Sequence, residues 1–231
     1  MRARGLFGVC VLLALIVFGY IVARDLSSRR QLRETAAPIV IKQPVAFANH
    51  TFDPTAPPAD MPPLRSGESA ECGSDFVSNA SVSGESRESD ATHATVTITG
   101  IKVTLQLKID TWVPLGATQR VIDHEEGHRQ ISEYYYQTAD KLAERIATRY
   151  MGRRVEITGA DLNAESSKML RQMAADIADE YNKELNPGPT QLLYDDITDH
   201  GRNDVVVQDA VAHAVKNVAI EWARPTTNPG T

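Results

Sequence analysis

The sequence predicts an α+β fold with a small antiparallel β-sheet, a helical half after it and one transmembrane helix at the N-terminus. Three observations support this fold class. Residues 5–23 contain no charged side chain. Residues 101–109 alternate between apolar and polar side chains, which is the period of a half-buried strand. From residue 119 onward, apolar residues recur every three or four positions, which is the period of an amphipathic helix.

The apolar run at the N-terminus is long enough to cross a membrane, since 19 residues at about 1.5 Å each reach across a core of about 30 Å. The run exceeds the roughly 7–15 residues of a signal-peptide core, which favours a retained anchor over secretion after cleavage. The short tail before the run is typical of an export signal. We therefore expect a single-pass protein of the inner membrane with its body in the periplasm or outside the cell. The Arg residues at positions 24–33 oppose this orientation under the positive-inside rule.

The composition indicates one acidic domain with attachments. The chain has 231 residues and a formal net charge of −6. Residues 1–33 hold six Arg and one Asp, a net charge of +5, which leaves 18 basic and 29 acidic residues, a net charge of −11. An acidic body excludes a nucleic-acid partner, because binding phosphates requires a basic face. The two cysteines, Cys10 and Cys72, exclude a disulfide framework.

The chain divides into three predicted segments. Residues 1–33 form the tail and transmembrane anchor with its basic flank, residues 34–74 form a spacer, and residues 75–231 form the folded domain. The spacer holds seven of the twelve prolines, which disfavour long helices. Within it, residues 39–41 and 45–47 are candidates for a short strand.

The alternating strand from Ile101 to Ile109 is preceded by Val96 and Ile98, which have the opposite parity. A hairpin with a two-residue turn at residues 99–100 explains the change of parity, and a glycine bulge in one long strand is the alternative. Helices are expected over the ranges 119–151, 161–185 and 203–222, with a polar loop at 194–201.

The first helix begins with the motif His124-Glu125-Glu126-Gly127-His128, which fits H-E-x-x-H. Histidines four residues apart on a helix lie on one face and can bind one zinc ion at about 2.0–2.1 Å. Glu125 lies one step round the helix, in the position of a general base. The motif therefore predicts Zn²⁺ as the cofactor, His124 and His128 as ligands, and Glu125 as the catalytic residue.

A catalytic zinc ion needs a third protein ligand. Position 131 is Ile, so the extended pattern with a glycine there is absent. The candidates are His200, His213, His93, His50, Glu165 and Glu180. His200 is preferred because it lies in the polar loop beside Gly201, where backbone can pass close by. Glu180 is the main competitor, since a Glu from a following helix also completes such sites.

The motif HEEGH, followed by an aromatic-containing helix and then by YDDITDHG at residues 194–201, resembles a bacterial family of zinc-dependent proteases of the cell envelope, named as a domain of unknown function. The resemblance covers roughly residues 75–222. It implies a zincin-like helical half, with His124 and His128 as ligands, Glu125 as the catalytic residue and His200 as the third ligand.

These observations lead us to expect a membrane-tethered zinc metalloendopeptidase that hydrolyses a peptide or protein substrate. A non-catalytic, zinc-stabilised binding module of the envelope is the alternative. Tyr194 and Asp195 either orient the ligands and stabilise a developing oxyanion, or only pack and cap the loop.

Overall fold

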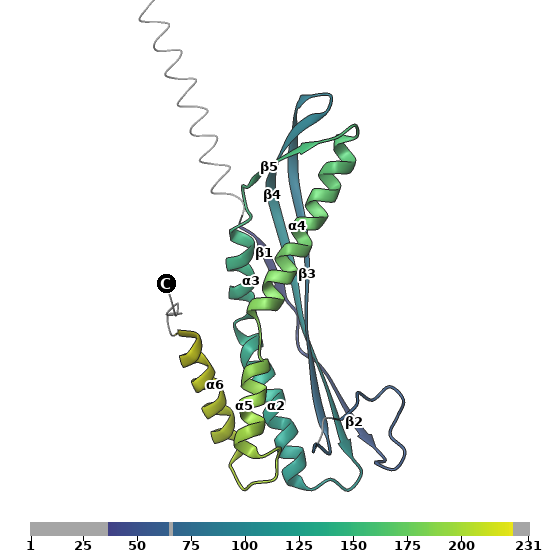
Figure 1. Ribbon diagram of the computed structural model, residues 1–231, viewed down its shortest axis with the longest axis vertical. Coiled ribbons are helices and arrows are strands. Elements are labelled where there is room, and N and C mark those ends of the chain that lie inside the picture. The colour runs from purple at the N-terminus through teal and green to yellow at the C-terminus, as the bar shows by residue number, and fades with distance from the viewer. Residues whose placement is uncertain (1–36, 65–66, 224–231) are drawn as a thin grey trace, which may run out of the picture.

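The computed structural model describes residues 37–64 and 67–223, with side chains up to residue 218. In Figure 1 the molecule is elongated, with α3 and α4 beside a long β-hairpin and α2, α5 and α6 gathered at one end. The elements are β1 (Ile39–Lys42), β2 (Ala46–Phe52), β3 (Glu71–Asp90), β4 (His93–Pro114), α2 (Gln119–Gln137), α3 (Ala139–Thr148), β5 (Arg154–Thr158), α4 (Leu162–Glu184), α5 (Gly188–Thr198) and α6 (Val207–Ala223).

The sheet is mixed, which corrects the expected antiparallel sheet. β3 pairs antiparallel with β4 over almost its whole length. The other edge of β4 pairs with β5 in antiparallel orientation and with β1 and β2 in parallel orientation. The chain therefore crosses from one edge of β4 to the other between β2 and β3. The sequence does not mark such a crossing, because parallel partners are not joined by a tight turn.

The change of parity in β4 is a bulge within one strand, so the hairpin expected at residues 99–100 is wrong and the bulge alternative is confirmed. Thr99 has no partner in β3, because its two neighbours pair with consecutive residues of that strand. The two flanking pairs are Ser83 with Gly100 and Gly84 with Ile98. An extra residue in one strand moves the following side chains to the other register, so both apolar sets face the same core.

The main core lies between the sheet and the helices on one face. The inward side chains of β4, from Ile101 to Ile109, are at most 3% exposed and pack against α3, α4 and the end of α2. The Tyr136 hydroxyl lies 3.0 Å from Leu105 O and 2.8 Å from Gln43 O, and donates to these carbonyls. The C-terminal end of α2 is thus fixed to the sheet, which leaves its motif-bearing N-terminal half at the end of the molecule.

The helices differ from the prediction at two places. The helix expected over 119–151 is divided at Thr138 into α2 and α3, and the Lys42 ammonium donates to the carbonyl of Gln137 at this break, at 2.8 Å. The polar loop expected at 194–201 is wrong for its first half, which belongs to α5.

The predicted transmembrane helix at residues 5–23 lies outside the described residues. Among the helices of residues 37–64 and 67–223, none has both the length and the apolar character needed to cross a bilayer.

The bulge predicts how two glycines of β3 respond to substitution. A Cβ at Gly84 would lie 2.8 Å from Val96 Cγ1 and 2.9 Å from Thr97 O, whereas one at Gly73 would meet only Asp110 O at 3.8 Å. We expect Gly84→Ala to lower the free energy of unfolding by about 1–3 kcal/mol through overpacking, and Gly73→Ala to change it little. Urea denaturation of both variants measures this. Equal effects at the two positions would contradict the account of the bulge.

The burial of Cys72 predicts that its thiol is alkylated slowly. It is half-buried in β3, and the Thr111 hydroxyl donates to its sulfur at 3.7 Å. Burial raises the pKa of the thiol to about 12, despite this hydrogen bond. In a Cys10→Ser chain we expect native Cys72 to react with iodoacetamide at pH 8 at least about 100-fold more slowly than in urea, because the thiolate is the nucleophile. Similar rates in the two conditions would contradict this burial.

Candidate metal centre

The H-E-x-x-H motif occupies the second and third turns of α2. Thr118 caps this helix, and its hydroxyl oxygen accepts from Val121 N at 3.4 Å. The two histidines and Glu125 are buried, with exposed fractions of 5% for His124, 4% for Glu125 and 9% for His128. Polar side chains buried to this degree require partners.

The partners lie on α5, which the sequence analysis missed. Pro187 and the following Gly-Pro begin this helix, where a missing N–H causes no loss. Its buried residues are Thr190, Tyr194, Asp195 and Thr198, which recur at helical spacing. Three of the four are polar, so a search for apolar periodicity passes over the helix. The turn signal of Pro187 was the available indication of a helix start.

Tyr194 packs into the space left by Gly127. Its ring stacks on His124 with centroids 5.1 Å apart and planes 13° apart, and its hydroxyl donates to His124 O at 3.2 Å. A Cβ at residue 127 would overlap the phenol ring and hydroxyl. The glycine of the HEEGH motif is therefore a packing requirement that lets α5 approach α2.

This approach brings three ligand atoms to one point. His128 Nε2 lies 2.9 Å from Asp195 Oδ1, His124 Nε2 lies 3.4 Å from the same oxygen, and the two Nε2 atoms are 3.2 Å apart. Ligands bonded at about 2.0–2.2 Å to a tetrahedral zinc ion are about 3.3–3.6 Å apart. The observed separations agree with this geometry to within a few tenths of an ångström.

Hydrogen bonds to the outer ring nitrogens orient both imidazoles. Gln191 Oε1 accepts from His128 Nδ1 at 2.6 Å. The Thr198 hydroxyl donates to Tyr194 O at 2.8 Å, so its oxygen accepts from His124 Nδ1, at 3.3 Å. With Nδ1 protonated in both rings, each Nε2 would offer its lone pair to an ion at the convergence point once it loses the proton that it shares with Asp195. This is the arrangement by which proteins prepare histidines to bind a metal.

The electrostatics of the cluster couple the carboxylate to the rings. Burial raises the pKa of Asp195, but hydrogen bonds from the two histidines and their charges lower it more, so its carboxyl remains ionised. Burial lowers the pKa of His128, while the hydrogen bond and charge of Asp195 raise it, and the net direction is upward. Positive charge is thus favoured where the three atoms meet.

Glu125 lies beside this cluster in a buried, acidic environment. Burial raises the pKa of its carboxyl to about 8, the charge of His128 lowers it, and the carboxylates of Glu71, Glu68 and Asp195 raise it further. A positive ion at the histidines would favour the ionised form.

His200 lies next to Asp195 but in a second group. Its Nδ1 is 4.0 Å from Asp195 Oδ1 and 3.6 Å from Glu68 Oε1. The ligand atoms of Glu68, Asp195 and His200 lie within 4.8 Å of one another, and this group shares only Asp195 with the two motif histidines. The sequence analysis missed Glu68, which precedes β3 with no motif around it.

The other candidate ligands are engaged elsewhere. Glu180 accepts from the Tyr150 hydroxyl at 3.1 Å and pairs with Arg149 at 2.6 Å, between α3 and α4. His50 stacks on Trp112, and His93 contacts Asp90 at the hairpin turn. In the described part of the chain, neither group of potential ligands includes these residues, His213 or Glu165.

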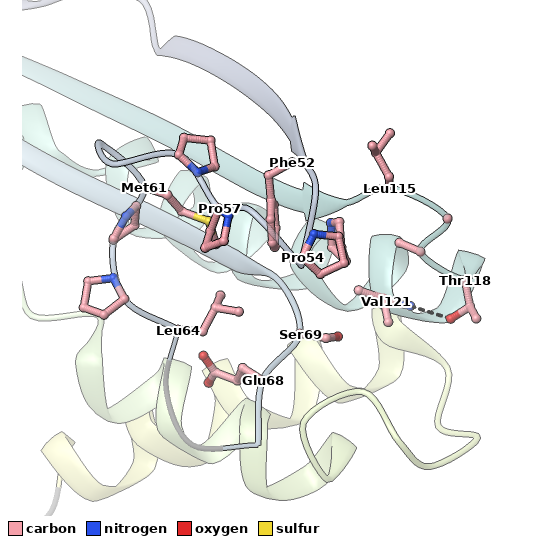
Figure 2. Close-up of a pocket in the computed structure, with 16 residues that line it drawn as sticks. Phe52, Pro54, Pro57, Met61, Leu64, Glu68, Ser69, Leu115, Thr118 and Val121 are labelled. Carbon is pink, nitrogen blue, oxygen red and sulfur yellow. Dashed lines mark hydrogen bonds between the residues drawn. The ribbon is translucent and has the colours of Figure 1, made fainter.

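Two pockets lie near the two groups of potential ligands. One, of about 410 Å³, is lined by His124, Tyr194 and Thr198 together with the chain before α6. The other, of about 740 Å³, is mostly apolar and lies between the proline-rich segment 54–64 and the start of α2. Figure 2 shows Glu68 beside Leu64 at its edge, with Val121 on the α2 side.

The chain matches no protein-family model, no curated protein and no solved structure. Its chemistry is therefore inferred from the site itself. The buried group of His124, His128 and Asp195 could hold a metal ion.

The position of Asp195 predicts that its substitution weakens zinc binding and that substitution of the adjacent Asp196 does not. Its carboxylate meets both histidines, whereas that of Asp196 is exposed. We expect Asp195→Asn to weaken zinc binding by about 100-fold or more, since losing even an outer-shell partner costs about 10–100-fold, and Asp196→Asn to leave it unchanged. Competition with a zinc-binding dye measures both affinities. Equal affinities would exclude Asp195 as a ligand.

Proposed function

We propose that this protein is a zinc-dependent peptidase, in which His124, His128 and Asp195 hold the ion. The observation that carries the proposal is the convergence of two imidazole nitrogens and one carboxylate oxygen at separations of 2.9–3.4 Å. Two nitrogens and one oxygen are a ligand set that suits zinc. Three protein ligands leave a fourth position for water or substrate, as catalytic zinc sites require.

Glu125 is the proposed general base. It precedes Glu126 in the motif and is buried beside the ligands, while Glu126 is half-buried and pairs with Arg129. A bound zinc ion would polarise the attacking water and the peptide carbonyl. Glu125 would accept the proton as the water oxygen bonds to the carbonyl carbon. When the C–N bond breaks, Glu125 would return that proton to the amine nitrogen.

The two pockets support a polypeptide substrate. One is lined in part by His124 and the other in part by Glu68. An extended peptide has side chains on both sides of the bond to be cleaved, so a site for it needs more than one pocket. The larger pocket is lined mainly by prolines and apolar side chains, which suits an apolar residue of the substrate.

A non-catalytic zinc-stabilised module is the second candidate, and one observation favours it. The three proposed ligands are at most 9% exposed, and closed sites are typical of structural zinc. Attachment to the inner membrane through residues 5–23, with the body in the periplasm, stays a prediction from the sequence. Membership of the envelope protease family likewise rests on the two motifs.

The two glutamates of the motif provide the test. We expect Glu125→Gln in the full-length chain to lower the rate of cleavage of denatured casein by about 10²–10⁴-fold, the usual contribution of a general base, and to leave the zinc content unchanged. Glu126→Gln, which alters the neighbouring side chain in the same way, should retain activity. The measurements are peptide release and zinc content by mass spectrometry. Bound zinc without cleavage by the unsubstituted chain would favour the non-catalytic module.

A further inference from the structure

The group beside the proposed zinc site has the composition of a second cation site. Glu68, Asp195 and His200 offer two carboxylates and one imidazole within 4.8 Å. We infer that these three residues bind a second divalent cation, with Asp195 shared between the two ions. The inference rests on the proposed zinc site and places a second cation beside it.

The backbone after α5 directs His200 to this point. Asp199, His200 and Gly201 have positive φ values of 48°, 52° and 73°, so the chain turns sharply at the end of the helix. His200 N donates to Asp195 O at 3.0 Å, which closes the turn. A Cβ at residue 201 would lie 3.0 Å from His124 Cβ, so this turn packs directly on the first site.

The Glu68 and His200 side chains are half-buried and approach each other. The Glu68 side chain is 9% exposed, and its Oε1 lies 3.6 Å from His200 Nδ1. That nitrogen is buried and makes no hydrogen bond within the described residues. A buried imidazole nitrogen without a hydrogen bond carries a desolvation cost, and a cation shared with the neighbouring carboxylate would remove it.

The charge of the region also favours a second cation. Glu68, Glu125 and Asp195 bring three carboxylates together. Within residues 37–64 and 67–223, neither Glu68 nor Glu125 pairs with Lys or Arg, and Glu68 contacts only His200 among the ion pairs of that part. When all three are ionised their charge is −3, so one divalent ion leaves a net charge of −1, and a second ion brings it to +1. Buried charges persist only where such compensation exists.

The geometry requires a small adjustment that the chain permits. The His200 distances of 3.6 and 4.0 Å exceed the 2.9–3.4 Å found at the first site. Glu68 lies between β2 and β3, outside any helix or strand, so it can move inward by a few tenths of an ångström. Two ions about 3.5–4 Å apart, bridged by a carboxylate, form a known type of hydrolytic centre.

The test is the number of zinc ions bound per chain. The full-length protein is stripped with a chelator, equilibrated with excess buffered zinc and analysed by mass spectrometry. We expect two ions in the unsubstituted chain and one in Glu68→Gln, which keeps the shape of the side chain. Glu88→Gln, an exposed position in β3, is the matched control and should retain two. His200→Ala is an independent second variant and should also retain one.

The outcomes separate this inference from the proposed function. One ion in the unsubstituted chain, retained in Glu68→Gln, would overturn the second site and leave the first intact. Two ions in both chains would overturn the assignment of Glu68. An unsubstituted chain without stoichiometric zinc would overturn both the second site and the proposed peptidase. Circular dichroism of each variant identifies any loss of zinc that follows from unfolding.

Discussion

The contact between Tyr194 and Gly127 sets the distance between α2 and α5. The Tyr194 ring occupies the space where any other residue at position 127 would place its Cβ. With the ring stacked on His124 and its hydroxyl bonded to the carbonyl of that residue, α5 is held close to α2 and in a fixed rotation. Asp195, the next residue of α5, then meets both histidines, while Gln191 and Thr198 reach their outer nitrogens.

The two halves of α2 pack on different parts of the molecule, and the contact between Tyr194 and Gly127 belongs to the motif half. The C-terminal end of the helix packs on the sheet through Tyr136, within the main apolar core. The motif half instead packs on α5 and α6, where a smaller apolar cluster includes Ile131 and Tyr194. A polar cluster between helices contributes less to stability than an apolar one. The long hairpin and its helices therefore supply most of the burial, and the motif end uses it as a rigid base.

The parts of the fold that could be predicted are those with local signals. The alternation of β4 and the helical spacing of His124 and His128 depend on neighbours in the sequence, so both are visible there. The parallel pairing of β1 and β2 depends on a crossing between the edges of β4, which no local pattern marks. The bulge at Thr99 was one of two explanations that local parity allows, and only the pairing with Gly84 decides between them.

In the candidate site, too, only the residues with a local sequence signal could be predicted. Its motif residues could be identified because their spacing is fixed by one helix. Asp195 was expected in a loop, where it would orient the ligands or stabilise an oxyanion, and not as a ligand. Its helix was missed because it buries Thr190 and Thr198 where an amphipathic helix normally buries apolar residues. Glu68 has no pattern around it and is brought to the site by tertiary packing alone. Third ligands are generally difficult to infer for this reason, since their position depends on the whole fold.

The ligands come from two helices that are distant in the sequence. Between His128 and Asp195 the chain forms α3, β5 and the whole of α4 before it returns to α2 in α5. An ion bound by both helices would act as a reversible cross-link that closes this long loop. For a covalent link across a loop of this size, the loss of chain entropy in the unfolded state is on the order of 4 kcal/mol. Ion binding would then add to the packing of Tyr194 in keeping α5 docked on α2, so the supply of the ion would influence the stability of one end of the molecule.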